Sequence, residues 1–191
     1  TTEIYTLSLH DALPISDEGS TGILMENNIV HHTTTGTFHQ HYGKENRLVN
    51  NILAFSETEQ LIRSRDEEHI SFFIEGNIIV MSNGRLLGST WKNGNYRLDN
   101  NLYWDINGNA FDFAGKTFAE WQAAGYDAHS RIADPLFEDI AGRDFRLKPD
   151  SPALDMGFNP IDVNEIGLYG EPDWVAKPKA APREAFVPPA K

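Results

Sequence analysis

Short apolar pairs follow an asparagine at four regularly spaced places along the chain. The four segments are ENNIV, VNNIL, EGNII and DNNLY, with Asn28, Asn51, Asn77 and Asn101 as their third residues. The steps between these asparagines are 23, 26 and 24 residues. Such a period, made of short β-prone pieces, is typical of a coil with several strands per turn, because helical repeats have longer units without β-branched runs. The pattern predicts an all-β fold, a right-handed parallel β-helix (solenoid) of about four coils.

The repeated asparagines have a physical reason to occupy one corner of successive coils. Stacked amides hydrogen-bond up and down such a column, and asparagine tolerates the left-handed conformation that a sharp bend requires. The alternative is a β-sandwich with four unrelated asparagine turns. The apolar pairs that repeat together with the asparagines favour the β-helix.

A second strand is expected after each asparagine corner, in the segments TFHQHY, LIRSR, LLGST and FDFA. Because strand side chains alternate, one set points inward and the other outward. Steps of 24, 25 and 24 residues place Phe38, Ile62, Leu87 and Phe111 in one inward column and Gln40, Ser64, Ser89 and Phe113 in another. The outward columns are then His39, Arg63, Gly88 and Asp112, and His41, Arg65, Thr90 and Ala114. A slip of one residue would turn all these side chains over.

The two ends of the chain depart from the repeat. Residues 116–125 are predicted to form a helix that covers the last coil, since Thr117 and Glu120 have capping-box spacing and Gly125 can end it. We expect a non-native leader over 1–16, coils over 17–115, a capping helix with an irregular C-terminal layer over 116–170, and an extended proline-rich tail over 171–191. No comparable cap precedes the first coil, so its uncapped N-terminal edge is expected to favour a homodimer.

Charge and composition narrow the class of partner. The net charge is −12 and the pI is near 4.9, so the chain should repel nucleic acid and anionic membranes. Neutral glycans are suitable ligands, and so are anionic ones wherever basic residues gather. No apolar stretch approaches the roughly 18 residues of a membrane span. The absence of cysteine excludes disulfides and thiolate chemistry.

The densest chemical segment is LIRSRDEEH, residues 61–69, expected one coil from FHQHYG, residues 38–43. Glycoside hydrolysis needs two carboxyl groups, about 5–5.5 Å apart for retention or about 6.5–9.5 Å for inversion. Asp66, Glu67, Glu68 and Asp112 are the local candidates, and Glu67 and Asp112 are the pair that we choose. A polysaccharide lyase would instead neutralise a uronate carboxylate with a cation and remove the adjacent carbon-bound proton with a base. The candidates for those roles are His39, His41, Arg63 and Arg65.

Plainer interpretations exist for the same residues. Both arginines can pair with the acidic run 66–68 in a solvated network of little energetic value. The HQH segment lacks a third ligand, so we predict no metal there, although the acidic run is compatible with calcium. Trp91 can stack on a sugar ring or pack inside the fold.

Several longer segments occur in an order that resembles bacterial right-handed β-helix proteins, most of all the C-terminal part of glycoside hydrolase family 141. They are FHQHYGKEN, NNILAF, RSRDEEHISF, WKNGNYRLDNNLYWD, FAEWQAAGYDAHSRIADPLF and DFRLKPDSPALDMGF. The resemblance covers residues 17 to about 170, with HQHYG and residues 63–69 as its more specific pieces. It implies a secreted or periplasmic bacterial enzyme that degrades polysaccharide, although no export signal is recognised in this chain.

These observations lead us to expect a glycoside hydrolase, or the C-terminal fragment of one, acting on plant or microbial polysaccharide or oligosaccharide. The expected catalytic residues are Glu67, Asp112 and His41, and the expected substrate-binding residues are His39, Arg63, Arg65, His69 and Trp91. We expect no cofactor apart from the calcium alternative. A polysaccharide lyase and a non-catalytic glycan-binding or structural fragment are the two other hypotheses.

Overall fold

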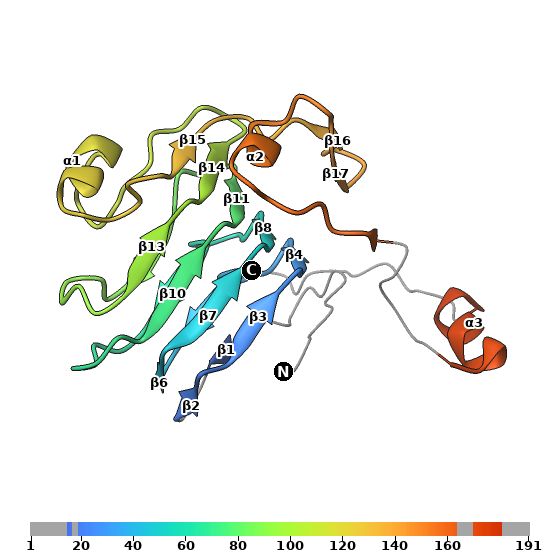
Figure 1. Cartoon of the computed structure of the whole chain (residues 1–191), viewed down its shortest axis with the longest axis horizontal. Helices are drawn as coiled ribbons and strands as arrows, with labels where there is room; N and C mark the ends of the chain where they lie inside the picture. Colours follow the sequence, from blue (N-terminus) through green and yellow to red (C-terminus); the bar gives the residue numbers. More distant parts are fainter. Residues whose placement is uncertain (1–14, 17–18, 164–169, 181–191) are drawn as a thin grey trace, which may run out of the picture. The chain divides into compact units, whose positions relative to one another are not determined.

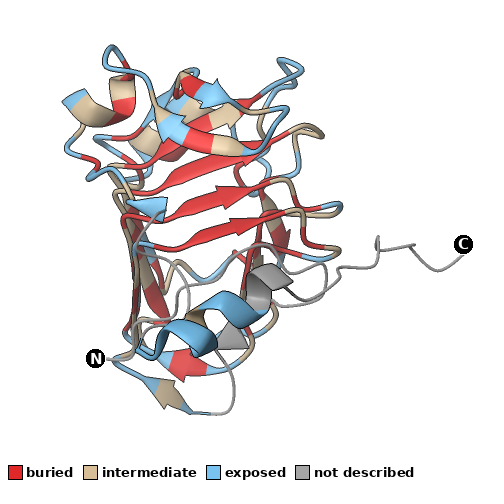
Figure 2. Cartoon of the chain, turned by 90° about the vertical axis from the view of Figure 1, so that its right-hand side faces the viewer, coloured by how far each residue is buried: buried red, intermediate tan, exposed pale blue. Residues whose placement is uncertain are grey.

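The computed structural model describes residues 15–16, 19–163 and 170–180 of the 191-residue chain. Its main feature is a parallel β-solenoid of about four turns, in which three sheets each receive one strand per turn (Figure 1). The strands are mainly buried, whereas the loops that join them are largely exposed (Figure 2). The predicted parallel β-helix is confirmed.

The three sheets follow one another around each turn. Sheet 1 contains β1 (Ile15–Ser16), β5 (Phe38–Gln40), β9 (Leu61–Arg63) and β12 (Leu87–Ser89). Sheet 2 contains β3 (Leu24–Glu26), β7 (Asn46–Val49), β10 (Phe72–Glu75) and β13 (Arg97–Asp99). Sheet 3 contains β4 (Ile29–His31), β8 (Ile52–Ala54), β11 (Ile78–Met81), β14 (Leu102–Asp105) and β15 (Arg131–Ile132). A short parallel pair, β2 (Ser20–Thr21) and β6 (Gly43–Lys44), precedes sheet 2 in the first two turns.

The asparagine corner joins sheets 2 and 3 and forms the predicted amide ladder. Asn28 donates its backbone N–H and its Nδ2 to Oδ1 of Asn51, at 3.0 and 2.9 Å. Asn51 donates in the same way to Asn77, at 2.9 Å for both bonds. Asn77 donates to Asn101 at 3.0 and 3.1 Å. Because these buried amides must be satisfied, the ladder fixes the register between successive coils.

The left-handed bend lies one residue earlier than predicted. The residue before each ladder asparagine has a positive φ, of 58° at Asn27, 55° at Asn50, 66° at Gly76 and 55° at Asn100. Asparagine and glycine adopt this conformation at the least steric cost. The first residue of each pair therefore makes the bend, and the second makes the ladder.

Sheet 3 is apolar on both faces, which explains why two apolar residues follow each ladder asparagine. The second residues of the pairs, Val30, Leu53, Ile79 and Tyr103, lie in the core inside the solenoid. The first residues, Ile29, Ile52, Ile78 and Leu102, lie in a second core together with Phe137, Phe145, Ala153 and Phe158. The C-terminal layer therefore covers the outer face of sheet 3.

That layer consists of an antiparallel hairpin, β16 (Phe137–Asp139) and β17 (Asp144–Leu147), followed by the short helix α2 (Pro152–Asp155). The bend asparagines hold it in place. Asn50 donates from Nδ2 to the carbonyl oxygen of Asn159 at 2.8 Å and accepts from the backbone N–H of Asn159 at 2.8 Å. Asn100 donates to the carbonyl oxygen of Met156 at 3.1 Å. One face of the asparagine corner thus stabilises the coils, and the other anchors the layer.

The hairpin contains an ion pair with a predictable pH dependence. Side-chain and backbone hydrogen bonds from Arg146 lower the pKa of the Asp144 carboxyl from its ordinary 3.8 to about 2. Because the folded pKa is depressed, the pair stabilises the fold above the ordinary pKa, and that contribution is lost as the pH falls towards 2. An NMR titration should find Asp144 titrating near 2. Arg146→Gln should return it towards 3.8, and Arg143→Gln should not. An ordinary value in the unmodified chain would contradict the prediction.

Helix α1 (Phe118–Ala123) closes the last coil, as the capping box predicts. Thr117 Oγ1 accepts from the backbone N–H of Glu120 at 3.3 Å, and the Glu120 carboxylate accepts from the N–H of Thr117 at 2.8 Å. Gly125, just past the helix, has a φ of 94°. Trp121 is buried in the solenoid core. The chain then adds β15 to sheet 3 beside β14.

A buried carboxylate, Asp127, ends the asparagine ladder and joins it to the cap. It accepts from Asn101 Nδ2 at 3.2 Å and from the Tyr103 hydroxyl at 3.0 Å. It also accepts from Trp121 Nε1 at 2.7 Å and from Ser130 Oγ at 2.5 Å. Burial raises the pKa of the Asp127 carboxyl, although its four hydrogen-bond donors act against the shift. The last coil and the capping helix therefore share one buried acceptor.

The chain from residue 162 onward forms a second unit. It contains helix α3 (Pro172–Ala180), so the extended tail predicted over 171–191 is wrong for this stretch. Pro172 lies at the helix start, where its missing N–H has no partner to lose, whereas Pro178 lies near the other end of the helix. The predicted leader up to residue 14 and the tail from residue 181 lie outside the described residues. Within the described ranges, no helix is long and apolar enough to cross a membrane.

Candidate functional site

The register of sheet 1 differs by one residue from the predicted register. The observed pairs between β5 and β9 are Phe38–Leu61, His39–Ile62 and Gln40–Arg63. Every β9 side chain therefore has the opposite orientation to the prediction, with Arg63 inward and Ser64 outward. The segment FDFA forms no strand in the part of the chain described, so Asp112 does not extend sheet 1.

Arg63 is therefore a buried residue and not part of a solvent-facing binding surface. Its side chain is 0% exposed. The guanidinium donates to Asp66 at 2.7 Å and to Asn93 Oδ1 at 2.9 Å. It also donates to Ser71 Oγ at 3.1 Å and lies 5.4 Å from the centre of the Tyr96 ring. Burial lowers the pKa of Arg63, although Asp66 and Glu67 oppose the shift. The arginine thus ties together the loops of two coils.

The outward side chains at the end of β9 and β5 converge on one hydroxyl. Ser64 Oγ lies 2.8 Å from Nε2 of His39 and 2.9 Å from Nδ1 of His41. The two imidazole centres are 6.2 Å apart. Both imidazoles are half-buried, so they are positioned by the sheet and still reach its surface. This His39–Ser64–His41 group brings two acid–base side chains together at the surface of sheet 1.

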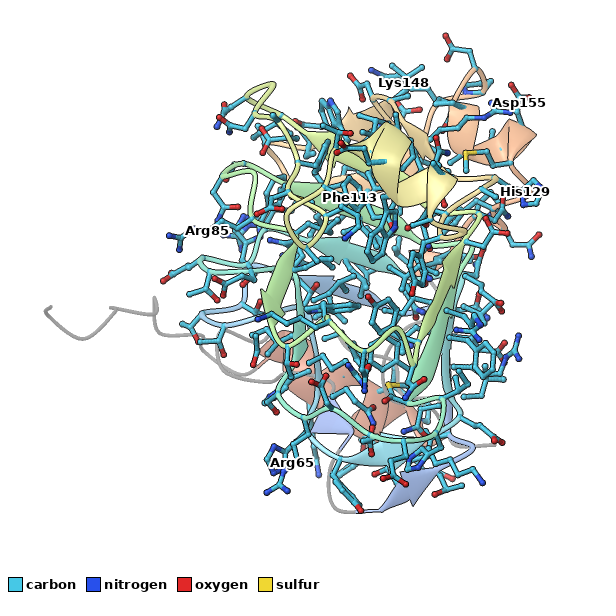
Figure 3. All side chains as sticks on the ribbon, turned by 90° about the vertical axis from the view of Figure 1, so that its left-hand side faces the viewer. Arg65, Arg85, Phe113, His129, Lys148 and Asp155 are labelled. Carbon is cyan, nitrogen blue, oxygen red and sulfur yellow. The ribbon has the colours of Figure 1, made fainter. Side chains whose placement is uncertain are left out.

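Arg65 and Tyr42 adjoin this group in the sequence, where they follow Ser64 and His41. Arg65, next to Ser64, is exposed and extends away from the ribbon (Figure 3). Its guanidinium lies 5.9 Å from the centre of the exposed Tyr42 ring, next to His41. Asp66 is engaged by Arg63, and within the described ranges Arg65 forms no ion pair. Arg65 is therefore placed to meet an anionic ligand.

Glu67 lies inside the corner between sheets 1 and 2. Its side chain is 2% exposed. Oε1 accepts from the backbone N–H of Gly43 at 2.8 Å and lies 3.3 Å from Nε2 of His69, while Oε2 is buried without a hydrogen-bond partner. The Glu67 carbonyl oxygen accepts from Asn93 and Asn95, at 2.9 and 2.6 Å. The structure thus gives Glu67 a role in joining coils and places two residues of the predicted set near it, His69 in direct contact and Arg63 within electrostatic range.

Two further predicted residues lie away from the histidines. Asp112 is exposed in the loop before α1, where its carboxylate accepts from the N–H of Gly115. Trp91 is only 4% exposed and donates from Nε1 to the carbonyl oxygen of Gly88 at 2.8 Å. Its ring packs on Tyr96, with centres 4.9 Å apart. The packing interpretation of Trp91 is therefore correct, and its burial leaves no free face for a sugar.

A separate hollow of about 450 Å³ lies at the ends of the sheet 3 strands. Its lining includes His32, Phe55, Glu57, Ile106 and the hairpin turn at Ile140. None of the predicted site residues lines it. Across the described ranges, no three histidine or acidic side chains are grouped to hold a metal ion.

No protein-family model, curated protein or solved structure matches the chain. The assignment of a parallel β-solenoid therefore rests on the structure alone. The resemblance to glycoside hydrolase family 141 stays a prediction from sequence motifs.

The sequence interpretation missed Ser64 and Tyr42. A signal for Ser64 was present in the asparagine spacing. The step of 23 residues from Asn28 to Asn51 places residue 61 beside Phe38, whereas the predicted alignment used a step of 24. Applied to sheet 1, the ladder spacing would have turned Ser64 outward and Arg63 inward.

Proposed function

We propose that this chain acts on an acidic polysaccharide and that the outer face of sheet 1 around Ser64 contacts the uronate units. The observation that carries the proposal is the convergence of two imidazoles on one hydroxyl, with Arg65 adjoining that serine in the chain and unpaired by any carboxylate of the described residues. A uronate carboxylate is the ligand that such an arginine attracts despite the acidic net charge of the chain. A polysaccharide substrate also implies a secreted or periplasmic location.

The reaction that these groups support best is β-elimination. Arg65 would neutralise the uronate carboxylate, which makes the proton on the adjacent carbon, C5, more acidic. One imidazole takes that proton, the C4–O4 bond breaks, a C4=C5 double bond forms, and the leaving oxygen takes a proton from the other imidazole. No carboxylate pair is required, which fits a face where neither Glu67 nor Asp112 is present.

Ser64 gives the two imidazoles different roles. Its hydroxyl carries one hydrogen, and the carbonyl oxygen of Gln40 lies at a long 3.5 Å. In the proposed arrangement the hydroxyl donates to one ring, at 2.8 or 2.9 Å, and accepts an N–H from the other. The ring that donates its N–H to Ser64 has a lone pair on the nitrogen facing away from the serine, and it acts as the base. The ring that accepts from Ser64 carries its proton on the nitrogen facing away from the serine, and it acts as the acid. After elimination, proton transfer through the hydroxyl restores both neutral rings with their roles exchanged.

Hydrolysis is the second candidate, and the buried unpaired Oε2 of Glu67 is the observation that favours it. Hydrolysis needs one carboxyl group that protonates the leaving oxygen, and Glu67 is the buried candidate for that role. Since Asp112 lies in a different loop, this alternative needs a second carboxylate that the predicted pair does not supply.

Product analysis with neutral and uronate-containing polysaccharides tests the proposal. We expect unsaturated uronide ends from the acidic substrates, detected by their ultraviolet absorbance. His41→Ala should lower the rate by about 10²–10⁴-fold, the usual contribution of a general acid or base. His129→Ala is the matched control, because His129 is exposed and paired with Asp99 away from sheet 1.

Two outcomes would contradict elimination. Saturated reducing ends that disappear in Glu67→Gln would assign hydrolysis. Binding of an acidic polysaccharide without any product would assign a non-catalytic glycan-binding solenoid.

A further inference from the structure

The asparagine ladder is complete at one end and unfinished at the other. At the C-terminal end, Asn101 donates to Asp127 and to Ser130, so its donors are satisfied. At the N-terminal end, Oδ1 of Asn28 is buried and has no hydrogen-bond partner among the described residues. Asn28 is 6% exposed, so solvent does not readily replace the missing donor. A buried amide oxygen left in this state costs about 1–3 kcal/mol.

The rest of the ladder shows what this oxygen is arranged to accept. Oδ1 of Asn51, Asn77 and Asn101 each accepts two bonds, a backbone N–H and an Nδ2–H, from the asparagine one coil earlier. Asn28 occupies the same corner with the same backbone geometry. Its Oδ1 therefore matches the donor pair of one further asparagine in a coil stacked on β3 and β4.

The strands beside Asn28 present the matching backbone edge. In the described residues, β3 pairs only with β7 and β4 only with β8, so each has one side without a strand partner. Sheet 1 continues one strand further, because β1 pairs with β5. Among the described residues, no sheet 2 strand, asparagine corner or sheet 3 strand is stacked on β3, Asn28 and β4. Residues 1–18 contain neither asparagine nor glutamine, so they carry no side-chain amide for this corner.

We propose that the β3–β4 edge is a docking surface for one more parallel β-helix coil, with an asparagine stacked on Asn28. The occupant is a polypeptide segment with the strand–asparagine–strand pattern of these coils. This proposal is independent of the proposed polysaccharide chemistry.

A second copy of this chain does not supply the required donors. In a two-fold dimer through this edge, two Asn28 oxygens would approach each other, while the Asn28 donors are already bound to Asn51 and Glu26. In a head-to-tail arrangement, the other end presents the capping helix, and its last asparagine is occupied by Asp127. The ladder chemistry therefore favours an added coil over the homodimer expected from the sequence.

The test is a full chain in which residues 19–41 are duplicated in tandem immediately before residue 19. The added copy has the 23-residue step of the first coil, so its asparagine stacks on Asn28. In the later coils the residue after the ladder asparagine donates its N–H to the coil before, as Ile52 does to the carbonyl oxygen of Asn28 at 2.8 Å, so the backbone amide of Ile29 points towards the added coil. Hydrogen-exchange NMR should show this amide exchanging at least about tenfold more slowly than in the unmodified chain, equivalent to about 1.4 kcal/mol.

The matched control is the same duplication with alanine in place of the asparagine of the added copy only. We expect it to lose most of the gain in protection. The proposal would be overturned if the Ile29 amide were protected equally in the asparagine and alanine duplications, or if neither duplication protected it. The unmodified chain should also be studied by sedimentation and by hydrogen exchange at several concentrations. A dimer that forms as the concentration rises and protects the Ile29 amide would assign the edge to a second copy, and would also overturn the proposal.

Discussion

Asp127→Ala should lower the free energy of unfolding by about 3–5 kcal/mol, the usual cost of removing one partner from a buried charged network. The carboxylate is fully buried and is the shared acceptor for four donors, from Asn101, Tyr103, Trp121 and Ser130. Removing it leaves these donors without a partner, because alanine offers no acceptor. Since the donors come from the last coil, the capping helix and the loop after it, the loss should loosen the cap first.

Urea unfolding followed by tryptophan fluorescence and by circular dichroism measures this effect. The matched control is Asp150→Ala, because Asp150 is exposed, and a surface change of this kind is usually within about 0.5 kcal/mol. Asp127→Asn should also destabilise the fold, since an amide has one acceptor oxygen and places two hydrogens among donors. Equal unfolding midpoints for Asp127→Ala and the control would show that the Asp127 carboxylate does not connect the capping helix to the asparagine ladder.

Arg63→Met and Arg65→Met should have opposite consequences, although the two arginines are two residues apart. Arg63→Met should cost about 1–3 kcal/mol of stability, because it removes the buried donor of Ser71 and Asn93, while the exposed Asp66 returns to solvent. Arg65→Met should change stability by less than about 0.5 kcal/mol, because the side chain is exposed. Under the proposed function, only Arg65→Met should weaken binding of acidic glycans per folded molecule.

Denaturant unfolding and glycan titration of the same two proteins separate stability from binding. Methionine preserves the length and apolar stem of arginine, so each variant removes mainly the charge and its hydrogen bonds. A stable Arg63→Met variant would contradict the buried network. If Arg65→Met bound an acidic glycan with unchanged affinity, Arg65 would not be the residue that binds the uronate carboxylate.

The repeat was predictable from the sequence because its chemistry is local. Each Asn-Asn or Gly-Asn pair contains one residue that tolerates the left-handed bend and one amide that stacks, and the apolar pair that follows supplies a strand. The capping helix was predictable for the same reason, since its signals at Thr117, Glu120 and Gly125 lie within one short segment.

The orientation of the site residues was not predicted, although they lie in strands that were. Side chains on a strand alternate, so one error of register between β5 and β9 exchanged Arg63 with Ser64. The correct register of sheet 1 follows from the 23-residue step between Asn28 and Asn51 if the same step is applied from β5 to β9.

The sequence by itself determined a parallel β-helix of about four coils, its amide ladder and its cap, because those features depend on which residues recur and at what spacing. Only the tertiary structure decided that Arg63, Glu67 and Trp91 are internal and that His39 and His41 meet at Ser64. It also showed the C-terminal layer covering sheet 3. These outcomes depend on contacts between residues 20 to 110 positions apart, where the packing of neighbouring coils and not local preference selects the inward and outward faces.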